Sequence, residues 1–256
     1  MRYSVIDRIR GITVISMILY HAVWDLVYIF HMDWLWYRST LAYTWQQSIC
    51  WTFILLSGFC WSFGRKKWKR GLIVFSAGVL ITAVTLIFMP EQRVVFGILT
   101  FLGSSMLFML PLEKLLSNVS AIGGLLGSGL LFVLFRNVNR GFLGFESFNF
   151  AKMPEVLYQN VLMTYLGFKQ EGFYSTDYFS ILPWLFLFVM GYFGYRLAKE
   201  SGKLEKLTVW NVDNSEKKKL MDYPFMVLDW IGRHSLAIYV LHQPIVYGVL
   251  SLLFQS

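Results

Sequence analysis

Charged residues are scarce in this chain. Asp, Glu, Lys and Arg make up 15% of its 256 residues, compared with about 25% in soluble globular proteins. Hydrophobic residues make up 56%, and the mean hydropathy is +0.53. This composition argues against a soluble globular domain and predicts a polytopic membrane protein.

Cysteine is almost absent as well. Cys50 and Cys60 are the only two, and both fall within one apolar run. They offer neither a disulfide framework nor a metal-ligand motif, so we expect small buried hydrophobic residues and no metal. Internal repeats and low-complexity tracts are also lacking, and we expect a single membrane domain over residues 1–256.

Long apolar runs, in contrast, recur along the chain. Each is long enough to cross a bilayer, which predicts an all-α transmembrane helix bundle of about seven spans. The first run is too long for a cleaved signal peptide, contains polar residues, and is followed by no A-x-A site. The expected spans are residues 11–30, 43–63, 71–89, 94–112, 119–135, 179–197 and 229–253.

Positive charge is distributed unequally between the two sides of such a bundle. With the N-terminus inside, 17 of the 23 Lys and Arg residues fall on the cytoplasmic side. The bias predicts an N-inside, C-outside topology. We attribute the net charge of +8 to this bias and to contact with anionic membrane lipids. Nucleic acid binding has little support, because the basic residues are dispersed among the span ends.

Three connecting stretches and one glycine-rich stretch each support a separate prediction. We expect residues 136–178 to form the largest outer loop, lying on the bilayer interface or folded over the outer mouth, with a short helix after Pro154. Residues 198–228 are rich in Lys and Glu and predict a cytoplasmic linker with some helix. RKKWKR at 65–70 is either a topology signal or a basic rim for a phosphorylated cofactor. GGLLGSGL at 123–130 indicates either a homodimer face or close packing within the bundle.

Three polar residues lie on one side of the predicted first helix. Asp25 lies one helical turn after His21, and Arg10 lies eleven residues before it, which returns to nearly the same face. A His–Asp pair within hydrocarbon is costly and survives mainly where it faces a bundle interior or a wet cavity. We therefore predict a functional site here, and the alternative is a buried polar pair that locks two helices together.

The last run carries a second polar stripe. Ser235, Tyr239 and His242 recur at intervals of four and three, so they share one helix face, and Gln243 adds a polar group at the same depth. Pro244 removes a backbone donor and leaves a carbonyl one turn earlier for another partner. The stripe serves either a functional site or hydrogen bonds between helices.

A third polar position precedes the sixth run, in the stretch STDYFSILPWL that begins at Ser175. Asp177 lies just before the run, where it either caps the N-terminus of that helix or contributes to a site. Pro183 is expected to kink the helix or to mark its true start.

Four stretches together resemble a known family. They are IDRIRGITVISMILYHAVWDL from Ile6, FGILTFLGSSM from Phe96, STDYFSILPWL from Ser175, and SLAIYVLHQP ending at Pro244. Over nearly its whole length the chain resembles the bacterial branch of the heparan-α-glucosaminide N-acetyltransferase catalytic-domain family. The Arg-x10-His spacing and the C-terminal pattern are also similar to membrane-bound O-acyltransferases that acylate exported polysaccharides.

The resemblance implies an enzyme of the bacterial cytoplasmic membrane that moves an acetyl group from cytosolic acetyl-CoA to an amino sugar or a sugar hydroxyl beyond the membrane. CoA carries phosphates and needs cationic anchors, which fits the basic residues of the cytoplasmic side. The residues assigned to the cofactor are Arg8, Arg10, Arg65, Tyr239 and His242, and those assigned to the acceptor are Asp177, Tyr178, Trp184 and Gln243.

His21 is the expected base, with Asp25 holding its tautomer as the third member of a triad does. In the lysosomal branch, Asn occupies the position of His21, and the key histidine lies about ten residues later. His31 falls close to that place and is the second candidate. An acetyl-histidine intermediate and direct transfer both stay open.

Two other classes of function stay open on the sequence. Intramembrane His and Asp also serve proton relays, which would suit a proton-coupled small-solute transporter. The lack of repeat symmetry argues against the transporter hypothesis. A structural subunit without chemistry is the third possibility, and release of thiol from acetyl-CoA separates the acyltransferase from both.

Overall fold

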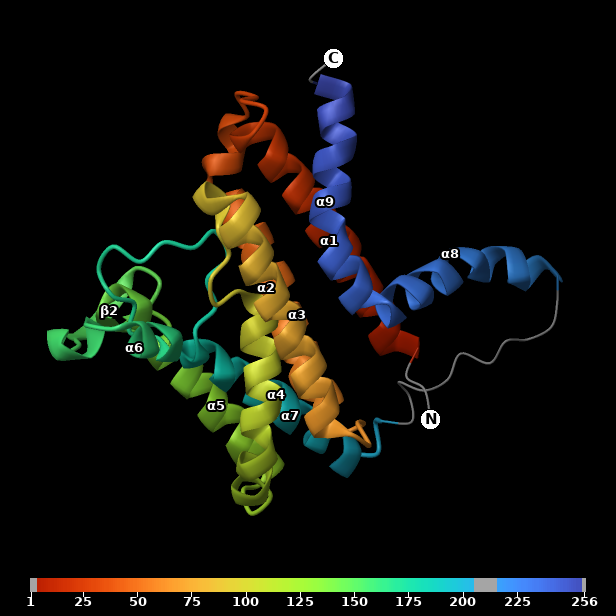
Figure 1. The fold of residues 1–256 in the computed structure, drawn as a ribbon. Helices are drawn as coiled ribbons and strands as arrows, with labels where there is room; N and C mark the ends of the chain where they lie inside the picture. The colour runs from red at the N-terminus through yellow and green to blue at the C-terminus, as the bar shows by residue number, and fades with distance from the viewer. Residues whose placement is uncertain (1–3, 205–215, 255–256) are drawn as a thin grey trace. The chain divides into compact units, whose positions relative to one another are not determined.

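The computed structural model describes residues 4–204 and 216–254. The chain forms two compact units, which we describe separately (Figure 1). The terminal unit combines Met1–Phe53 with Ser201–Ser256, and the central unit is Ile54–Glu200. The boundary between the units falls within one helix, α2 (Thr40–Trp61).

The terminal unit packs the first helix of the chain against the last two. Its long helix α1 (Ser4–Tyr28) packs against both α8 (Glu216–Arg233) and α9 (Ser235–Phe254), which follow each other near the C-terminus (Figure 1). A short 3-10 helix, η1 (Leu35–Arg38), leads from α1 to α2. The pairing of α1 with α9 places two polar helix stripes, far apart in sequence, against each other.

Two glycines allow the backbones of α1 and α8 to touch. A β-carbon at Gly232 would lie 1.9 Å from the carbonyl oxygen of Asp7, and one at Gly11 would lie 2.3 Å from that of Leu228. Both distances are well below van der Waals contact. Small residues at helix crossings permit such close approach in membrane proteins, where apolar side chains gain little by leaving lipid.

Aromatic side chains fix the start of α2 against α1. The indole N–H of Trp45 donates to Ser16 Oγ at 2.8 Å. Tyr37 of η1 is buried, and its ring lies 5.2 Å from that of Tyr20. With Val27 and Ala42, Tyr37 forms a small hydrophobic cluster that turns the chain back along α1.

The central unit consists of two helix pairs. Helix α3 (Lys67–Phe88) packs along α4 (Ile98–Leu116), and α5 (Ala121–Phe135) packs along α7 (Ile181–Glu200). A 3-10 turn, η2 (Pro90–Gln92), follows α3. Figure 1 shows α3 and α4 side by side along most of their length.

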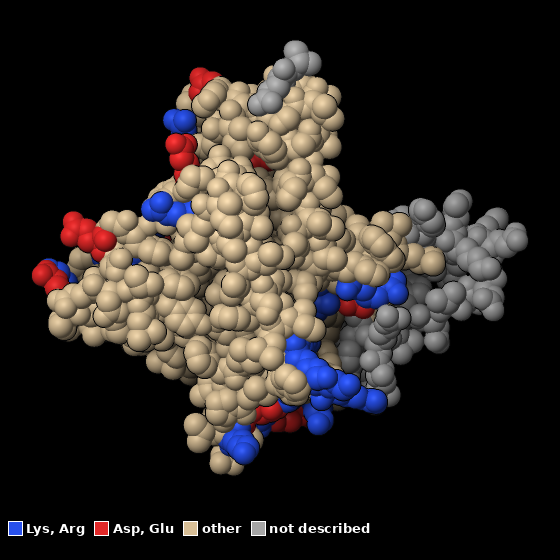
Figure 2. Space-filling model, viewed as in Figure 1, with Lys and Arg blue, Asp and Glu red and all other residues tan. Residues whose placement is uncertain are grey.

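Polar contacts define the two ends of the central unit. At one end, Lys67 Nζ binds Glu113 at 2.6 Å, Arg196 donates to the Leu116 carbonyl at 2.9 Å, and Arg70 donates to the Cys60 carbonyl at 3.3 Å. Lys and Arg gather at this end, where α3 begins (Figure 2). It is the end for which the charge bias predicts a cytoplasmic location. The opposite end holds a folded segment, residues 136–180.

Residues 136–178 of this segment were expected to form the largest outer loop, and they have regular structure of their own. The 3-10 turn η3 (Val138–Arg140) precedes an antiparallel hairpin of β1 (Phe142–Phe145) and β2 (Phe148–Lys152), then η4 (Glu155–Tyr158) and α6 (Val161–Leu166). The short helix after Pro154 is therefore confirmed as a 3-10 turn. The hairpin was not predicted. The buried side chain of Asn137 organises it, because its amide nitrogen donates to the carbonyl oxygens of Glu146 and Phe148 at 2.9 and 3.2 Å.

The all-α membrane bundle predicted from the apolar runs is confirmed in its main features. In the part of the chain that the structure describes, six segments are long and apolar enough to cross a membrane. The predicted run 43–63 corresponds to α2, which carries Gln46, Gln47 and Ser48 and is not among the six. The count of seven spans and the topology stay predictions. The six segments are Ser4–Tyr28, Lys67–Phe88, Ile98–Leu116, Ala121–Arg140, Ile181–Glu200 and Ser235–Phe254.

Two boundaries differ from or refine the sequence prediction. The run 229–253 is not one helix: α8 ends at Arg233 and α9 begins at Ser235, with the amide of His234 shared between the carbonyls of Trp230 and Ile231. In α7, Leu182 is extended (φ −91, ψ 134), so the continuous helix starts at Pro183, as proline at a first helical position predicts. Part of the predicted linker 198–228, residues 205–215, lies outside the described residues.

Replacing Gly232 with Ala should destabilise the contact between α1 and α8. The added methyl group would collide with the Asp7 carbonyl, a backbone atom that cannot rotate away. We expect a loss of about 1–3 kcal/mol, typical of overpacking, measured as a lower midpoint of thermal unfolding in detergent. Gly248→Ala on α9 is the matched control, because a β-carbon at that position would have nothing within 4 Å. Equal midpoints for the two variants would contradict the close-packing account.

Candidate functional site

A buried hydrogen bond joins the two polar stripes of the terminal unit. Asp25 of α1 is 0% exposed, and its Oδ1 accepts from the side-chain amide of Gln243 on α9 at 2.7 Å. The two residues stand 218 positions apart in sequence. A carboxylate removed from water needs such a donor, because an unpaired buried charge is strongly unfavourable.

Two histidines meet beside this bond. The rings of His21 on α1 and His242 on α9 lie 4.8 Å apart between centroids, at an interplanar angle of 60°. His242 is 7% exposed, and its Nδ1 donates to the Tyr239 carbonyl of its own helix at 2.6 Å. The ring of Tyr239 lies 5.4 Å from that of His242. Four polar residues predicted from two distant stretches thus form one cluster between α1 and α9, which we call the His–Asp cluster: His21, Asp25, His242 and Gln243.

The contacts within the His–Asp cluster differ from a catalytic triad in one respect. Asp25 was expected to hold the tautomer of His21 from one turn away. In the described part of the chain, the hydrogen bond to its carboxylate comes from Gln243, and His21 contacts the ring of His242 instead. Tertiary packing supplies both partners, which the spacing within α1 alone did not reveal.

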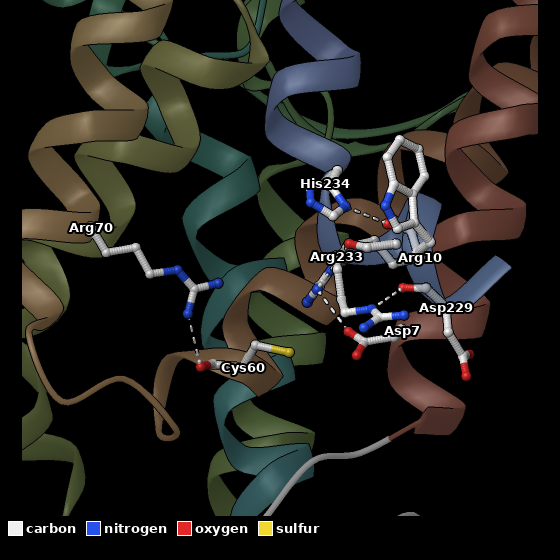
Figure 3. A network of polar contacts seen from close by, with 9 residues as sticks. Asp7, Arg10, Cys60, Arg70, Asp229, Arg233 and His234 are labelled. Carbon is white, nitrogen blue, oxygen red and sulfur yellow. Dashed lines mark hydrogen bonds and ion pairs between the residues drawn. The ribbon is translucent and has the colours of Figure 1, made fainter. Parts of the chain in front are cut away.

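Both arginines near the start of α1 make contacts within the protein. Arg8 Nε donates to Asp229 at 3.0 Å, and Arg10 Nη1 donates to Asp7 at 3.3 Å and to the Gly232 carbonyl at 3.4 Å. Figure 3 shows Asp7, Arg10 and Asp229 together where α8 ends. These contacts tie α1 to α8. A role of Arg8 and Arg10 in binding CoA stays a prediction, and such a role would add an anionic ligand to charges already paired.

His31 lies apart from the cluster. It follows the C-terminal end of α1, is exposed, and has a positive φ of 57°. A positive φ is uncommon for a residue other than glycine. The structure therefore places His21, and not His31, in contact with a second histidine.

The remaining predicted site residues belong to the central unit. Asp177 was expected either to cap its own helix, α7, or to contribute to a site; the structure shows it capping a different helix, and its role in a site stays a prediction. Its Oδ2 accepts from the amide of Ile98 at 3.0 Å and so caps α4. The preceding residue, Gly97, leaves room for the carboxylate, because a β-carbon there would lie 2.8 Å from Oδ2. Burial raises the pKa of Asp177 to about 6, although the bond from Ile98 favours the ionised form.

Backbone contacts hold the Asp177 segment against the loop before α4. The amide of Phe179 donates to the Phe96 carbonyl at 2.8 Å, that of Thr176 donates to the Arg93 carbonyl at 3.1 Å, and that of Val95 donates to Ser175 Oγ at 2.9 Å. Two stretches that carried the family resemblance, FGILTFLGSSM and STDYFSILPWL, therefore meet in space.

Tyr178 and Trp184 have structural partners in the same unit. The hydroxyl of Tyr178 donates to the Thr164 carbonyl at 2.6 Å and ties this segment to α6. Trp184 is 4% exposed, and the guanidinium of Arg136 lies 4.8 Å from its ring. Arg65 is exposed in the connection between α2 and α3. Contact of these residues with a substrate or cofactor stays a prediction.

Comparison with known families identifies the chain. The family model described as "Heparan-alpha-glucosaminide N-acetyltransferase, catalytic" matches residues 2–244. The chain belongs to this family. The match includes both halves of the His–Asp cluster, and together with the apolar helices it makes the protein a membrane acyltransferase. Comparison with curated proteins and with solved structures gives no match.

The sequence did not reveal three features of these sites. The contact between His21 and His242 depends on how α1 and α9 pack, and each histidine alone gave no sign of the other. The cap from Asp177 to α4 crosses 79 positions. Asn137 had one usable signal, since it directly precedes a short phenylalanine-rich stretch with glycines that allow a hairpin.

Replacing Asp177 with Asn should remove a pH-dependent part of the stability. The folded protein holds the Asp177 proton up to about pH 6, whereas an unfolded Asp releases it near pH 4. The stabilisation is therefore complete at low pH and declines as the pH rises through about 6. Asn keeps an oxygen for the Ile98 amide and does not ionise.

The measurement is the difference in unfolding free energy between wild type and Asp177→Asn in detergent at several pH values. We expect the difference to change by about 1–2 kcal/mol between pH 4 and pH 7, after allowance for partial solvent exposure. A difference that stays constant with pH would contradict the raised pKa.

Proposed function

We propose that the protein transfers an acetyl group from cytosolic acetyl-CoA to an amino sugar or a sugar hydroxyl on the extracytoplasmic side of the bacterial cytoplasmic membrane. The His–Asp cluster is the observation that carries this proposal. It combines groups able to move protons with burial between two helices that are long and apolar enough to span a bilayer.

The chemistry requires a proton acceptor beside the nucleophile. As the nitrogen or oxygen of the acceptor attacks the acetyl carbon, it loses a proton, and the thiolate of CoA leaves and takes up a proton. A histidine suits both transfers because its ordinary pKa lies near neutrality. We assign this role to His21, with the nearby carboxylate of Asp25 stabilising the positive charge that develops.

The basic end of the central unit offers a candidate anchor for the phosphates of CoA. Arg65 is exposed there and, among the described residues, makes no ion pair like those that engage Arg8 and Arg10 in the terminal unit. A guanidinium binds phosphate through paired charge-assisted hydrogen bonds. Arg65 is therefore the anchor for CoA that we favour among the three arginines.

Three of the residues predicted to bind the acceptor lie in the central unit, at the end that carries the hairpin. Asp177, Tyr178 and Trp184 all lie at this end of the central unit, in a segment held by backbone hydrogen bonds. Such a segment is a rigid support for a carboxylate and aromatic rings, which are the groups that bind sugars. Membrane lipids surround the bundle in this account.

His21→Ala should abolish acetyl transfer while leaving acetyl-CoA binding intact. Removing a general acid–base group typically costs about 10²–10⁴-fold in turnover. The measurement is release of free thiol from acetyl-CoA by the purified protein in detergent, with and without glucosamine. His31→Ala is the matched comparison, because His31 lies outside the cluster.

The outcomes separate the classes of function. Acceptor-dependent thiol release that is lost in His21→Ala supports the proposal. Normal turnover in His21→Ala with loss in His31→Ala would move the catalytic role to His31. Wild-type protein that neither binds acetyl-CoA nor releases thiol would contradict an acetyl-CoA-dependent enzyme and favour a transporter or a structural subunit.

A further inference from the structure

The His–Asp cluster contains three buried atoms without a hydrogen-bond partner among the residues that the structure describes. They are Oδ2 of Asp25, Nε2 of His242 and Oε1 of Gln243. Buried polar atoms in proteins are nearly always paired, so each exception calls for an explanation. Two of the three atoms belong to His242 and Gln243, which are adjacent on α9. The third belongs to Asp25, which Gln243 binds.

The contact of His242 with its own helix fixes its tautomer. A backbone carbonyl oxygen only accepts hydrogen bonds, so the 2.6 Å contact from Nδ1 to the Tyr239 carbonyl requires the proton on Nδ1. In the neutral ring, Nε2 then carries a lone pair and no proton. His242 presents a bare proton acceptor inside the helix pair.

The amide of Gln243 is oriented by the same reasoning. A carboxylate oxygen accepts, so the amide nitrogen of Gln243 faces Asp25 Oδ1 and the amide oxygen faces away. All three unpaired atoms are therefore acceptors. A group that brings hydrogens, such as an amine or a hydroxyl, matches the chemistry of these atoms, and an anion such as a CoA phosphate does not.

His21 differs from His242 in its surroundings. His21 is partly exposed, and its described contacts are with the rings of Tyr20 and His242. His242 is 7% exposed and is held by a backbone hydrogen bond. Of the two rings in contact, His242 has the orientation and tautomer that a proton acceptor needs before its substrate arrives.

We propose that His242 is a second proton-transferring residue of the reaction. Gln243 is a positioning residue, because its side-chain amide holds the carboxylate of Asp25. This rests on the proposed function and changes the expected role of His242 from binding CoA to acting on the acceptor. The acceptor N–H or O–H gives its proton to Nε2 while its nitrogen or oxygen bonds to the acetyl carbon. The carbon–sulfur bond breaks with its electron pair on sulfur, and the proton on Nε2 reaches the thiolate through His21, whose ring contacts that of His242.

The variant His242→Asn removes the proton acceptor but keeps the hydrogen bond that holds the side chain in place. The amide nitrogen of Asn occupies the place of Nδ1 and still donates to the Tyr239 carbonyl, whereas nothing replaces Nε2. His234→Asn is the matched control, because His234 Nδ1 also contacts a carbonyl of its own helix, that of Trp230 at 2.9 Å, yet the residue is exposed and lies outside the cluster.

We expect His242→Asn to lower kcat about 100-fold or more, with the KM for acetyl-CoA and the melting temperature close to those of wild type. His234→Asn should keep wild-type kcat. A His242→Asn variant that turns over at the wild-type rate, or that raises only the KM for acetyl-CoA, would overturn the proposal.

An exchange of the two partners tests the positioning role of Gln243. Gln243→Leu removes the donor to Asp25 and should lower kcat. Asp25→Asn combined with Gln243→Glu restores an amide–carboxylate pair in the reverse direction. We expect the exchange to recover the melting temperature lost in Gln243→Leu but not kcat, because the carboxylate has moved to α9. Recovery of both would show that the pair serves packing alone.

A spectroscopic readout on wild-type protein does not depend on activity. Nitrogen NMR of protein labelled at its histidines should show His242 with a protonated Nδ1 and a bare Nε2, the signal being assigned by its loss in His242→Asn. A proton on Nε2 and none on Nδ1 would overturn the inference even if transfer is observed. A wild-type protein without thiol release but with the expected tautomer would contradict the proposed function and leave the acceptor geometry of the cluster standing.

Discussion

The hydrogen bond between Gln243 and Asp25 is the contact on which the terminal unit depends. A carboxylate with no exposed surface within an apolar helix must receive donors from another helix. Only α9 supplies one among the described residues, so α9 must lie against α1 in a single register. Gly11 and Gly232 meet a related demand at the start of α1, since they let α8 approach it to backbone contact.

The hydrogen bond between Gln243 and Asp25 also affects which chemical groups the His–Asp cluster leaves unpaired. Holding Asp25 with Gln243 leaves acceptor atoms unpaired and brings two histidine rings together. This arrangement stabilises the fold less than a fully paired cluster would, because unpaired buried acceptors are unfavourable. A substrate that donates hydrogen bonds to these acceptor atoms forms interactions that they lack within the protein. The site therefore binds a substrate with N–H or O–H groups in preference to one without them.

The residues of the cluster were predictable from the sequence, but their partners were not. Polar residues stand out in apolar helices, and helical spacing placed His21 with Asp25 and Tyr239 with His242 on common faces. Spacing describes one helix at a time, however. It therefore assigned Asp25 to His21, whereas packing gave it to Gln243.

The central unit shows the same limit. The apolar runs located α3, α4, α5 and α7 to within a few residues, because length and hydropathy alone decide whether a segment suits lipid. Asp177 illustrates what they cannot decide. Its nearest helix in sequence is α7, yet the loop folds so that the carboxylate meets the start of α4. The hairpin of β1 and β2 also escaped prediction, because four or five residues per strand give too short an alternating pattern.

Transfer of an acetyl group across a sealed membrane tests the account most directly. Protein reconstituted into lipid vesicles, with labelled acetyl-CoA only outside and glucosamine only inside, separates donor from acceptor by the bilayer. The account predicts labelled N-acetylglucosamine inside vesicles whose protein has its cytoplasmic side outward, and none with vesicles lacking protein. Product formed only when donor and acceptor share one side would contradict it.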